Sequence, residues 1–184
     1  NATDAMVRRA ASEALRAQSS ANLAAHVAET SAPLARALHD ADWRVYYAAR
    51  DALAKSGPAA IPALMEALGN PEARVAHMAQ EALVRIGKPS IPALIDAIRQ
   101  APSNPAKSDW AAVALGLLGA DAFAQLAQLA STPQESLPAR IAAVAALGKT
   151  RNPKAITTLQ GVYADQYPDL CIAIVHAVSN VASA

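Results

Sequence analysis

Apolar residues recur along this chain at the spacing of helix faces, in units that repeat after 30 residues. The segment 40–69 matches the segment 70–99 in both identical and conservative residues. The identical pairs include Arg44/Arg74, Val45/Val75, Ala49/Ala79, Leu53/Leu83, Gly57/Gly87, Ile61/Ile91, Pro62/Pro92 and Leu64/Leu94. This self-similarity is typical of a repeat protein built from one short structural unit.

Each unit predicts two helices joined by a short turn. The positions predicted to be buried in the unit 40–69 are Val45, Ala48, Ala49, Ala52, Leu53 and Ser56 in the first helix, and Ile61, Leu64 and Leu68 in the second. Gly57 follows the first stripe, where a helix commonly ends in a left-handed residue that glycine adopts without steric cost. Pro62 falls in the first turn of the second helix, where its missing N–H is tolerated. Neither helix can bury its apolar face alone, so the units must stack.

The pattern extends in both directions with some drift. We predict units over residues 3–39, 40–69, 70–100, 101–131, 132–165 and 166–184, which together form a single repeat domain. The downstream stripes include Trp110, Ala111, Ala114, Leu115, Phe123, Leu126, Leu129, Ala143, Leu147, Ile156, Leu159 and Val162. The glycines expected to end first helices are Gly57, Gly87, Gly119 and Gly148. Upstream, residues 7–15 predict a further first helix, and their longer distance to the next unit indicates an insertion around residues 18–29.

The two ends of the chain differ from the units between them. The last unit predicts one helix around residues 170–178 that is apolar on more than one face, whereas a capping repeat needs a polar outer side. Either the solenoid continues beyond this helix, or the helix associates with another molecule. At the other end, we interpret Asn1 and Ala2 as the remnant of an expression tag. The expected compartment is then cytoplasmic by default, and periplasmic if an upstream signal peptide was removed.

Composition narrows the fold to helices. Hydrophobic residues make up 53% of the chain and aromatic residues only 4%, and alanine, the strongest helix former, is abundant. We therefore predict an all-α fold, a right-handed α-α superhelix of the α-solenoid type, with about five helix pairs plus a terminal helix.

Charge and cysteine content exclude several classes of function. Sixteen basic and fifteen acidic residues give a formal charge of +1, whereas binding to nucleic acid depends on a concentrated basic surface. One cysteine permits neither an intrachain disulfide nor a cysteine-rich metal site. No apolar run has the length of a membrane span. We therefore expect neither a nucleic-acid partner nor a transmembrane segment.

The units resemble HEAT repeats, in particular the class named after phycobilisome lyases. The residues that carry the resemblance are Val7 to Ala11 with Ala14 and Leu15, Trp43 to Val45 with Ala48, Ala49, Ala52 and Leu53, and Ala60 to Leu64. The resemblance implies an armadillo-like fold, but such repeats serve scaffolds, transport receptors, chromophore lyases and DNA glycosylases alike. The arginine usual at the second signature position is present as Arg8 and Arg140, and it is replaced by Tyr46, Ala76, Ser108 and Cys171.

No set of residues in the sequence predicts catalysis or a bound cofactor. His26, His39, His77 and His176 lack a second ligand at metal-binding spacing, so we interpret them as surface or interface histidines. Cys171 lies in an apolar helix and is interpreted as a structural thiol. Trp110 is expected in the core. Tyr46 and Tyr47 are adjacent, so at least one should reach solvent, where it is a candidate contact or an inter-repeat packing residue.

The second helices, which line the concave surface in the proteins that this chain resembles, provide the candidate binding site. An outward row two residues after each buried leucine consists of Arg36, Glu66, Asp96, Gln128 and Gly161. Its neighbouring row consists of Met65, Ile95, Ala127 and Gln160, and it forms either an apolar strip or part of the core. Successive helices would place members of a row about 10 Å apart. The mixed charge suits a protein surface better than a phosphate backbone.

We therefore predict a non-enzymatic scaffold that binds a protein or peptide through its concave face. The predicted contacts are Arg36, Met65, Glu66, Ile95, Asp96, Gln128 and Gln160. The resemblance leaves two alternatives open, a subunit of a chromophore (bilin) lyase and a binder of DNA lesions. The lyase would need a tetrapyrrole cavity, and the lesion binder a basic groove.

Overall fold

The computed structural model describes residues 23–162 and 167–182, and the regular elements in these ranges are all helical. The predicted all-α fold of the α-solenoid type is thereby confirmed. The chain divides into two compact units, the first ending at Ser90 and the second beginning at Ile91. The helix predicted over residues 7–15 lies outside the described residues.

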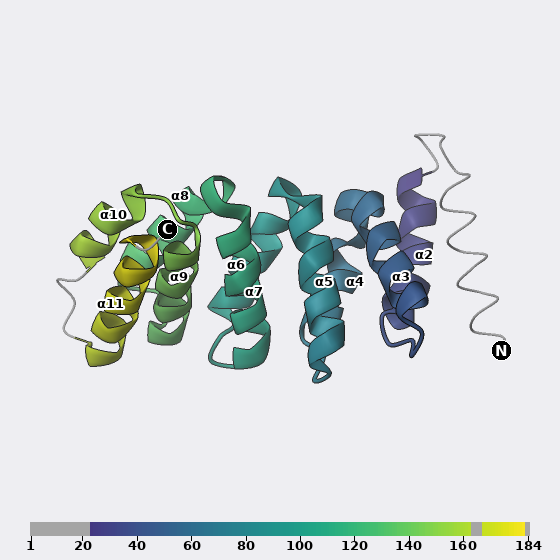
Figure 1. The fold of residues 1–184 in the computed structure, drawn as a ribbon, viewed down its shortest axis with the longest axis horizontal. Helices are drawn as coiled ribbons and strands as arrows, with labels where there is room; N and C mark the ends of the chain where they lie inside the picture. The colour runs from purple at the N-terminus through teal and green to yellow at the C-terminus, as the bar shows by residue number, and fades with distance from the viewer. Residues whose placement is uncertain (1–22, 163–166, 183–184) are drawn as a thin grey trace. The chain divides into compact units, whose positions relative to one another are not determined.

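The first unit consists of two layers of helices. Its elements are α2 (Leu23–Ala37), α3 (Trp43–Ser56), the short 3-10 helix η1 (Gly57–Ala60), α4 (Ile61–Leu68), α5 (Ala73–Ile86) and η2 (Lys88–Ser90). Helix α3 packs beside α5, and α2 contacts α4 behind them (Figure 1). The core between the layers contains the fully buried leucines Leu34, Leu38, Leu53, Leu64, Leu68 and Leu83.

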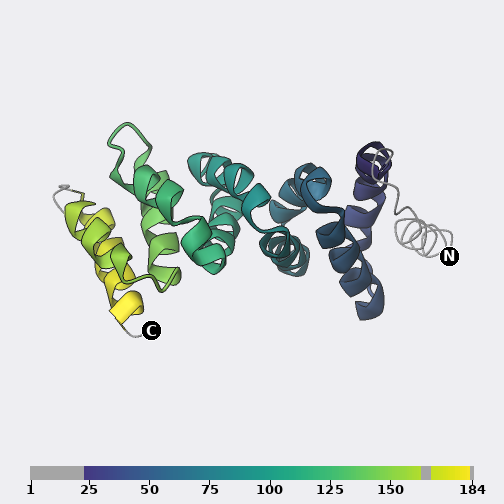
Figure 2. The same ribbon diagram turned by 90° about the horizontal axis from the view of Figure 1, so that it is seen from above.

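The second unit repeats this arrangement. Its elements are α6 (Ile91–Arg99), α7 (Pro105–Leu118), η3 (Gly119–Asp121), α8 (Phe123–Ser131), α9 (Leu137–Lys149), α10 (Lys154–Val162) and α11 (Pro168–Ala182). Helices α7, α9 and α11 lie side by side (Figure 1), and Figure 2 shows yellow α11 against green α9 from above. The largest fully buried side chains are Leu94, Ile98, Leu115, Leu126, Leu147 and Leu159.

The positions predicted to be buried in the unit 40–69 are confirmed in part. Ala49, Leu53, Leu64 and Leu68 are buried, whereas Val45, Ala52, Ser56 and Ile61 are half-buried. The prediction for Ala48 is wrong, because Ala48 is exposed on α3. Trp110, predicted in the core, is half-buried. The segment expected as an insertion is helical where it is described, since α2 begins at Leu23 and is longer than α4.

Short polar side chains start the first helices of the first unit. Asp40 Oδ1 accepts a hydrogen bond from the backbone N–H of Asp42 at 2.8 Å, and Asn70 Oδ1 accepts one from Glu72 at 2.9 Å. In both turns a side-chain oxygen accepts a hydrogen bond from the backbone N–H of the residue two positions later. Asp42 then caps α3 by accepting from the N–H of Arg44. The 30-residue repeat thus extends to the turn before each helix, although Glu72 does not cap α5 as Asp42 caps α3.

Glycines end three of the first helices, and a fourth glycine has a different role. Gly57, Gly87 and Gly119 have φ of 64°, 80° and 60°, positive values that glycine adopts without steric cost, as predicted for a glycine that ends a helix. The same prediction for Gly148 is wrong, because α9 continues through it to Lys149. A Cβ at Gly148 would lie 2.6 Å from the Cα of Ala177 in α11, so this glycine permits close helix packing.

Two buried serines differ in whether their hydroxyls are satisfied. Ser108 Oγ is buried in α7 without a hydrogen-bond partner among the described residues. Ser90 Oγ donates to the backbone carbonyls, at 3.0 Å from Leu83 O and 2.7 Å from Gly87 O. An unsatisfied buried hydroxyl costs stability, whereas a satisfied one adds to it.

We expect Ser108→Ala to raise the free energy of unfolding by about 1 kcal/mol, because it removes the unsatisfied hydroxyl. The matched change Ser90→Ala should lower it by about 1 kcal/mol, because the hydroxyl that donates to the carbonyls of Leu83 and Gly87 is lost. Urea denaturation of both variants measures the difference. A loss of stability in both variants would contradict the assignment of Ser108 as unsatisfied.

Candidate protein-interaction surfaces

A groove of about 260 Å³ runs between α2 and α4 in the first unit. Its lining residues are Ala32, Ala35, Arg36, His39, Ala63, Glu66, Ala67 and Asn70. Four of the eight are alanines, so the side chains at the base of the groove are short and a bound chain can approach the helix backbones. The groove includes Arg36 and Glu66, two members of the predicted outward row.

Arg36 and Glu66 give the groove one cation and one anion. Both side chains are exposed, and neither makes a hydrogen bond or ion pair with another residue in the part of the chain that the structure describes. Beyond them, His39 Nδ1 lies 3.5 Å from Glu72 Oε2, and His39 Nε2 lies 3.4 Å from Asn70 Nδ2. The two charged groups are therefore available to a ligand, while the polar groups beside them interact with one another.

The predicted contacts in the second unit are exposed, and one of them, Asp96, forms an ion pair within the chain. Asp96, Gln128 and Gln160 all have exposed side chains. Asp96 Oδ1 lies 3.2 Å from Nη1 of Arg99, whose Nε donates to Glu135 Oε1 at 3.0 Å. The hydrogen bond to Glu135 is the main cause that raises the pKa of Arg99 above its ordinary value. Asp96 is thus less available than Glu66, because its carboxylate already has a cation beside it.

The apolar row beside these positions does not form a surface strip. Ile95 is only 6% exposed, so its predicted role as a partner contact is wrong. It belongs to the core, which was the alternative interpretation of this row. The physical reason is that α6 is buried over most of its circumference, at Ile91, Leu94, Ile95, Ala97 and Ile98. Met65 and Ala127 are half-buried, and only Gln160 of this row is exposed.

An aromatic cluster on α3 is a surface that the sequence indicated only in part. Trp43 is 62% exposed, and its ring meets that of Tyr47 edge-on at 6.3 Å between centroids. Tyr47 is 38% exposed, which confirms that one of the two adjacent tyrosines reaches solvent. The Tyr46 ring lies 4.8 Å from that of Tyr47, and the guanidinium of Arg74 lies over it. Exposed Trp and Tyr are enriched at binding hot spots.

A network of charged residues links α3 to α5 next to this cluster. Arg50 pairs with Asp51 at 2.7 Å and with Glu81, and Arg85 pairs with Asp51 at 2.7 Å. Burial lowers the pKa of Arg50, but the hydrogen bonds that its guanidinium donates to Asp51 and Glu81 more than offset this effect, so the pKa is raised overall. Because Arg50 is largely buried and doubly paired, the network holds neighbouring helices together and leaves little charge for a ligand.

Comparison with protein families decides the classification. A family model described as HEAT repeats matches residues 30–109 and 91–179, which is most of the chain. The chain belongs to the HEAT-repeat family. HEAT repeats typically mediate protein interactions and are typically non-catalytic. No curated protein matches the sequence. The assignment to the class named after phycobilisome lyases stays a prediction.

Arginines in these HEAT repeats hold one helix pair to the next. The Arg74 guanidinium in α5 donates to the carbonyls of Leu38 and Asp40 just beyond the end of α2, at 3.1 and 3.0 Å. In the second unit, Arg140 of α9 is 4% exposed, and its Nε donates to the carbonyl of Ala130 near the end of α8 at 3.1 Å. A cation at a helix C-terminus is favourable, so these arginines act in packing rather than in binding.

The described residues of the HEAT repeats were compared with two further requirements, those of a metal site and those of a membrane span. Within residues 23–162 and 167–182, no three His, Cys, Asp or Glu residues gather in a way that would hold a metal ion. None of the helices described here combines the length and apolar content needed to span a bilayer.

Helix α11 has exposed apolar side chains. Ile172 and Val175 are 57% and 60% exposed, and association of the chain through this helix stays a prediction.

Proposed function

We propose that this HEAT-repeat chain is a non-enzymatic scaffold that binds an extended segment of a partner protein along its second helices. The groove between α2 and α4 is the proposed site in the first unit, and Asp96, Gln128 and Gln160 are proposed contacts in the second unit. The observation that carries the proposal is the pair of charged side chains, Arg36 and Glu66, which stand unpaired among the described residues above a base of alanines.

A protein segment fits this groove better than the two alternatives that the family resemblance leaves open. Nucleic acid gains affinity by neutralising several phosphates, and the groove offers one cation together with an anion. The groove volume of about 260 Å³ also falls below the range of about 300–1,000 Å³ that is usual for small-molecule sites. A peptide chain carries charges of both signs, and its backbone can approach the alanines closely.

The double charge reversal R36E/E66K tests this function. Partners are first captured from source cells with the wild-type chain. We expect the double variant to bind them about tenfold or more weakly, because the loss of a charged contact in a groove typically lowers the binding free energy by over 1 kcal/mol. Lys55→Glu is the control for a charge reversal outside the groove, since Lys55 is exposed on α3 and does not line the groove. Equal capture by the wild type and the double variant would contradict the proposal.

A further inference from the structure

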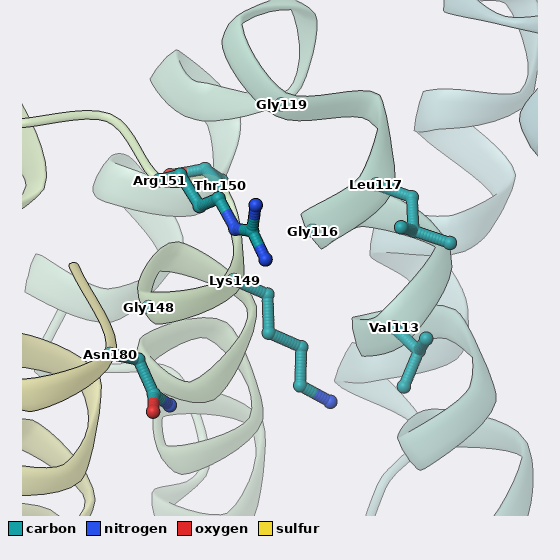
Figure 3. Close-up of a pocket in the computed structure, with 9 residues that line it drawn as sticks. All are labelled: Val113, Gly116, Leu117, Gly119, Gly148, Lys149, Thr150, Arg151 and Asn180. Carbon is teal, nitrogen blue, oxygen red and sulfur yellow. The ribbon is translucent and has the colours of Figure 1, made fainter. Parts of the chain in front are cut away.

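A second and larger pocket lies at the C-terminal ends of α7 and α9 and beside α11. It is open to solvent and has a volume of about 830 Å³. Its lining residues are Val113, Gly116, Leu117, Gly119, Gly148, Lys149, Thr150, Arg151 and Asn180 (Figure 3). The lining contains no acidic residue. The pocket therefore combines glycines, two aliphatic side chains and two cations.

Glycines create the shape of this pocket. A Cβ on Gly116 would lie 2.5 Å from the Cβ of Lys149, and one on Gly148 would lie 2.6 Å from the Cα of Ala177. Helices α7, α9 and α11 are therefore packed more closely than side chains at these positions would allow. The close packing brings Lys149 next to α7 and leaves Leu117 at the rim.

Lys149 and Arg151 are the charged groups of the pocket. Both side chains are exposed, and neither makes an ion pair or hydrogen bond with another described residue. Figure 3 shows both side chains reaching into the pocket, toward the side where Val113 and Leu117 stand. Two cations that line the same pocket, without a carboxylate among the lining residues, favour an anionic ligand.

Carbonyl groups at the ends of α7 and α9 already accept hydrogen bonds from donors other than Lys149 and Arg151. The N–H of Gly119 donates to the carbonyls of Gly116 and Leu115 at the end of α7. At the end of α9, the carbonyl of Leu147 accepts from the N–H of Thr150 and from its hydroxyl, at 2.7 Å. Because these carbonyls already have donors, Lys149 and Arg151 are not needed to cap them.

Arg151 has an unusual backbone conformation. Its φ is 52°, the left-handed region that residues other than glycine seldom adopt, and among the described non-glycine residues it alone has a positive φ. Backbone strain of this kind often marks a functional site. Here it accompanies a guanidinium directed into the pocket (Figure 3).

Leu117 gives the pocket an apolar contact. It is 63% exposed, although it lies in a helix whose neighbouring Leu115 is fully buried. Val113, one helical turn earlier, also lines the pocket. A ligand that satisfies both parts of the surface must present an aliphatic side chain next to a carboxylate.

We propose that this pocket binds an acidic segment of a partner protein in which Asp or Glu stands beside an aliphatic residue. Lys149 and Arg151 bind the carboxylates, and Leu117 and Val113 contact the aliphatic side chain. The proposal deepens the scaffold function by adding a second docking site. It uses residues other than Arg36 and Glu66, so the two proposals can fail separately.

Selection of short random peptides displayed on phage tests the site. The wild-type chain and the neutralised variant K149Q/R151Q are used in parallel, and circular dichroism checks that the variant is folded. We expect the wild type to select peptides rich in Asp or Glu next to Leu, Ile or Val. The neutralised variant should lose this preference, because the cations that bind the carboxylates are gone.

Affinities of one selected peptide then separate the surfaces. We expect its dissociation constant to rise about tenfold or more with K149Q/R151Q, and several-fold with Leu117→Ala. R36E/E66K should leave it unchanged, even if the groove between α2 and α4 binds nothing. Three results would overturn the proposal: selection without acidic enrichment, equal binding to K149Q/R151Q, or equal binding of a single-stranded DNA of the same charge.

Discussion

Replacing Leu115 by alanine is expected to lower the free energy of unfolding by about 2–5 kcal/mol. Leu115 is fully buried in α7, and truncation of a buried leucine loses its transfer free energy and leaves a cavity. For a domain with marginal stability, this is a large fraction of the total. Chemical denaturation followed by circular dichroism measures the change.

The control for this change lies two residues further along the same helix. Leu117 is 63% exposed, so Leu117→Ala should alter the free energy of unfolding by no more than about 0.5 kcal/mol. The two variants share residue type and helix, and therefore differ mainly in burial. If both were equally destabilising, the orientation of α7 in the second unit would be wrong.

Gly148→Ala is expected to destabilise the protein by about 1–3 kcal/mol, although alanine is normally the better helix former. The added methyl would lie 2.6 Å from the Cα of Ala177 and 2.8 Å from its Cβ, so α9 and α11 would have to separate. Backbone atoms cannot move aside as the end of a flexible side chain can. The midpoint of urea denaturation reports the loss.

Gly161 provides the opposite case. It lies in α10, and a Cβ there would meet no atom of the described residues within 4 Å. Gly161→Ala should therefore raise the free energy of unfolding by about 0.5 kcal/mol, since alanine reduces the conformational entropy of the unfolded chain. A stabilising effect of Gly148→Ala, equal to that of Gly161→Ala, would contradict the close approach of α9 and α11.

The periodicity of the sequence was sufficient to predict the helix pairs, because each pair repeats the same local rules. Gly57 follows an apolar stripe and precedes Pro62, and those neighbours alone indicate a helix end and a helix start. Gly148 follows a similar stripe, but its role depends on Ala177 in another helix. A contact between distant residues leaves no local pattern, so the sequence could not distinguish the two glycines.

The candidate surfaces were less predictable than the fold. The spacing from the buried Leu64 was enough to place Glu66 outside, whereas the position of Ile95 depended on how completely its neighbours surround α6. The pocket beside Leu117 was not predicted at all. Its cations follow a helix end, and only the packing of α7, α9 and α11 brings Leu117, Lys149 and Arg151 together. The one signal for this pocket in the sequence was a basic residue at the end of a helix, a pattern too common to indicate a binding site.

Hydrogen exchange of the chain with and without a captured partner is the sharpest test of binding at the groove between α2 and α4. We expect the partner to slow exchange in residues 32–39 and 63–70, the segments that line this groove. Added protection around Lys149 would agree with the second docking site. Protection that is absent from both groove segments and confined to the aromatic cluster of α3 would show that the partner binds elsewhere.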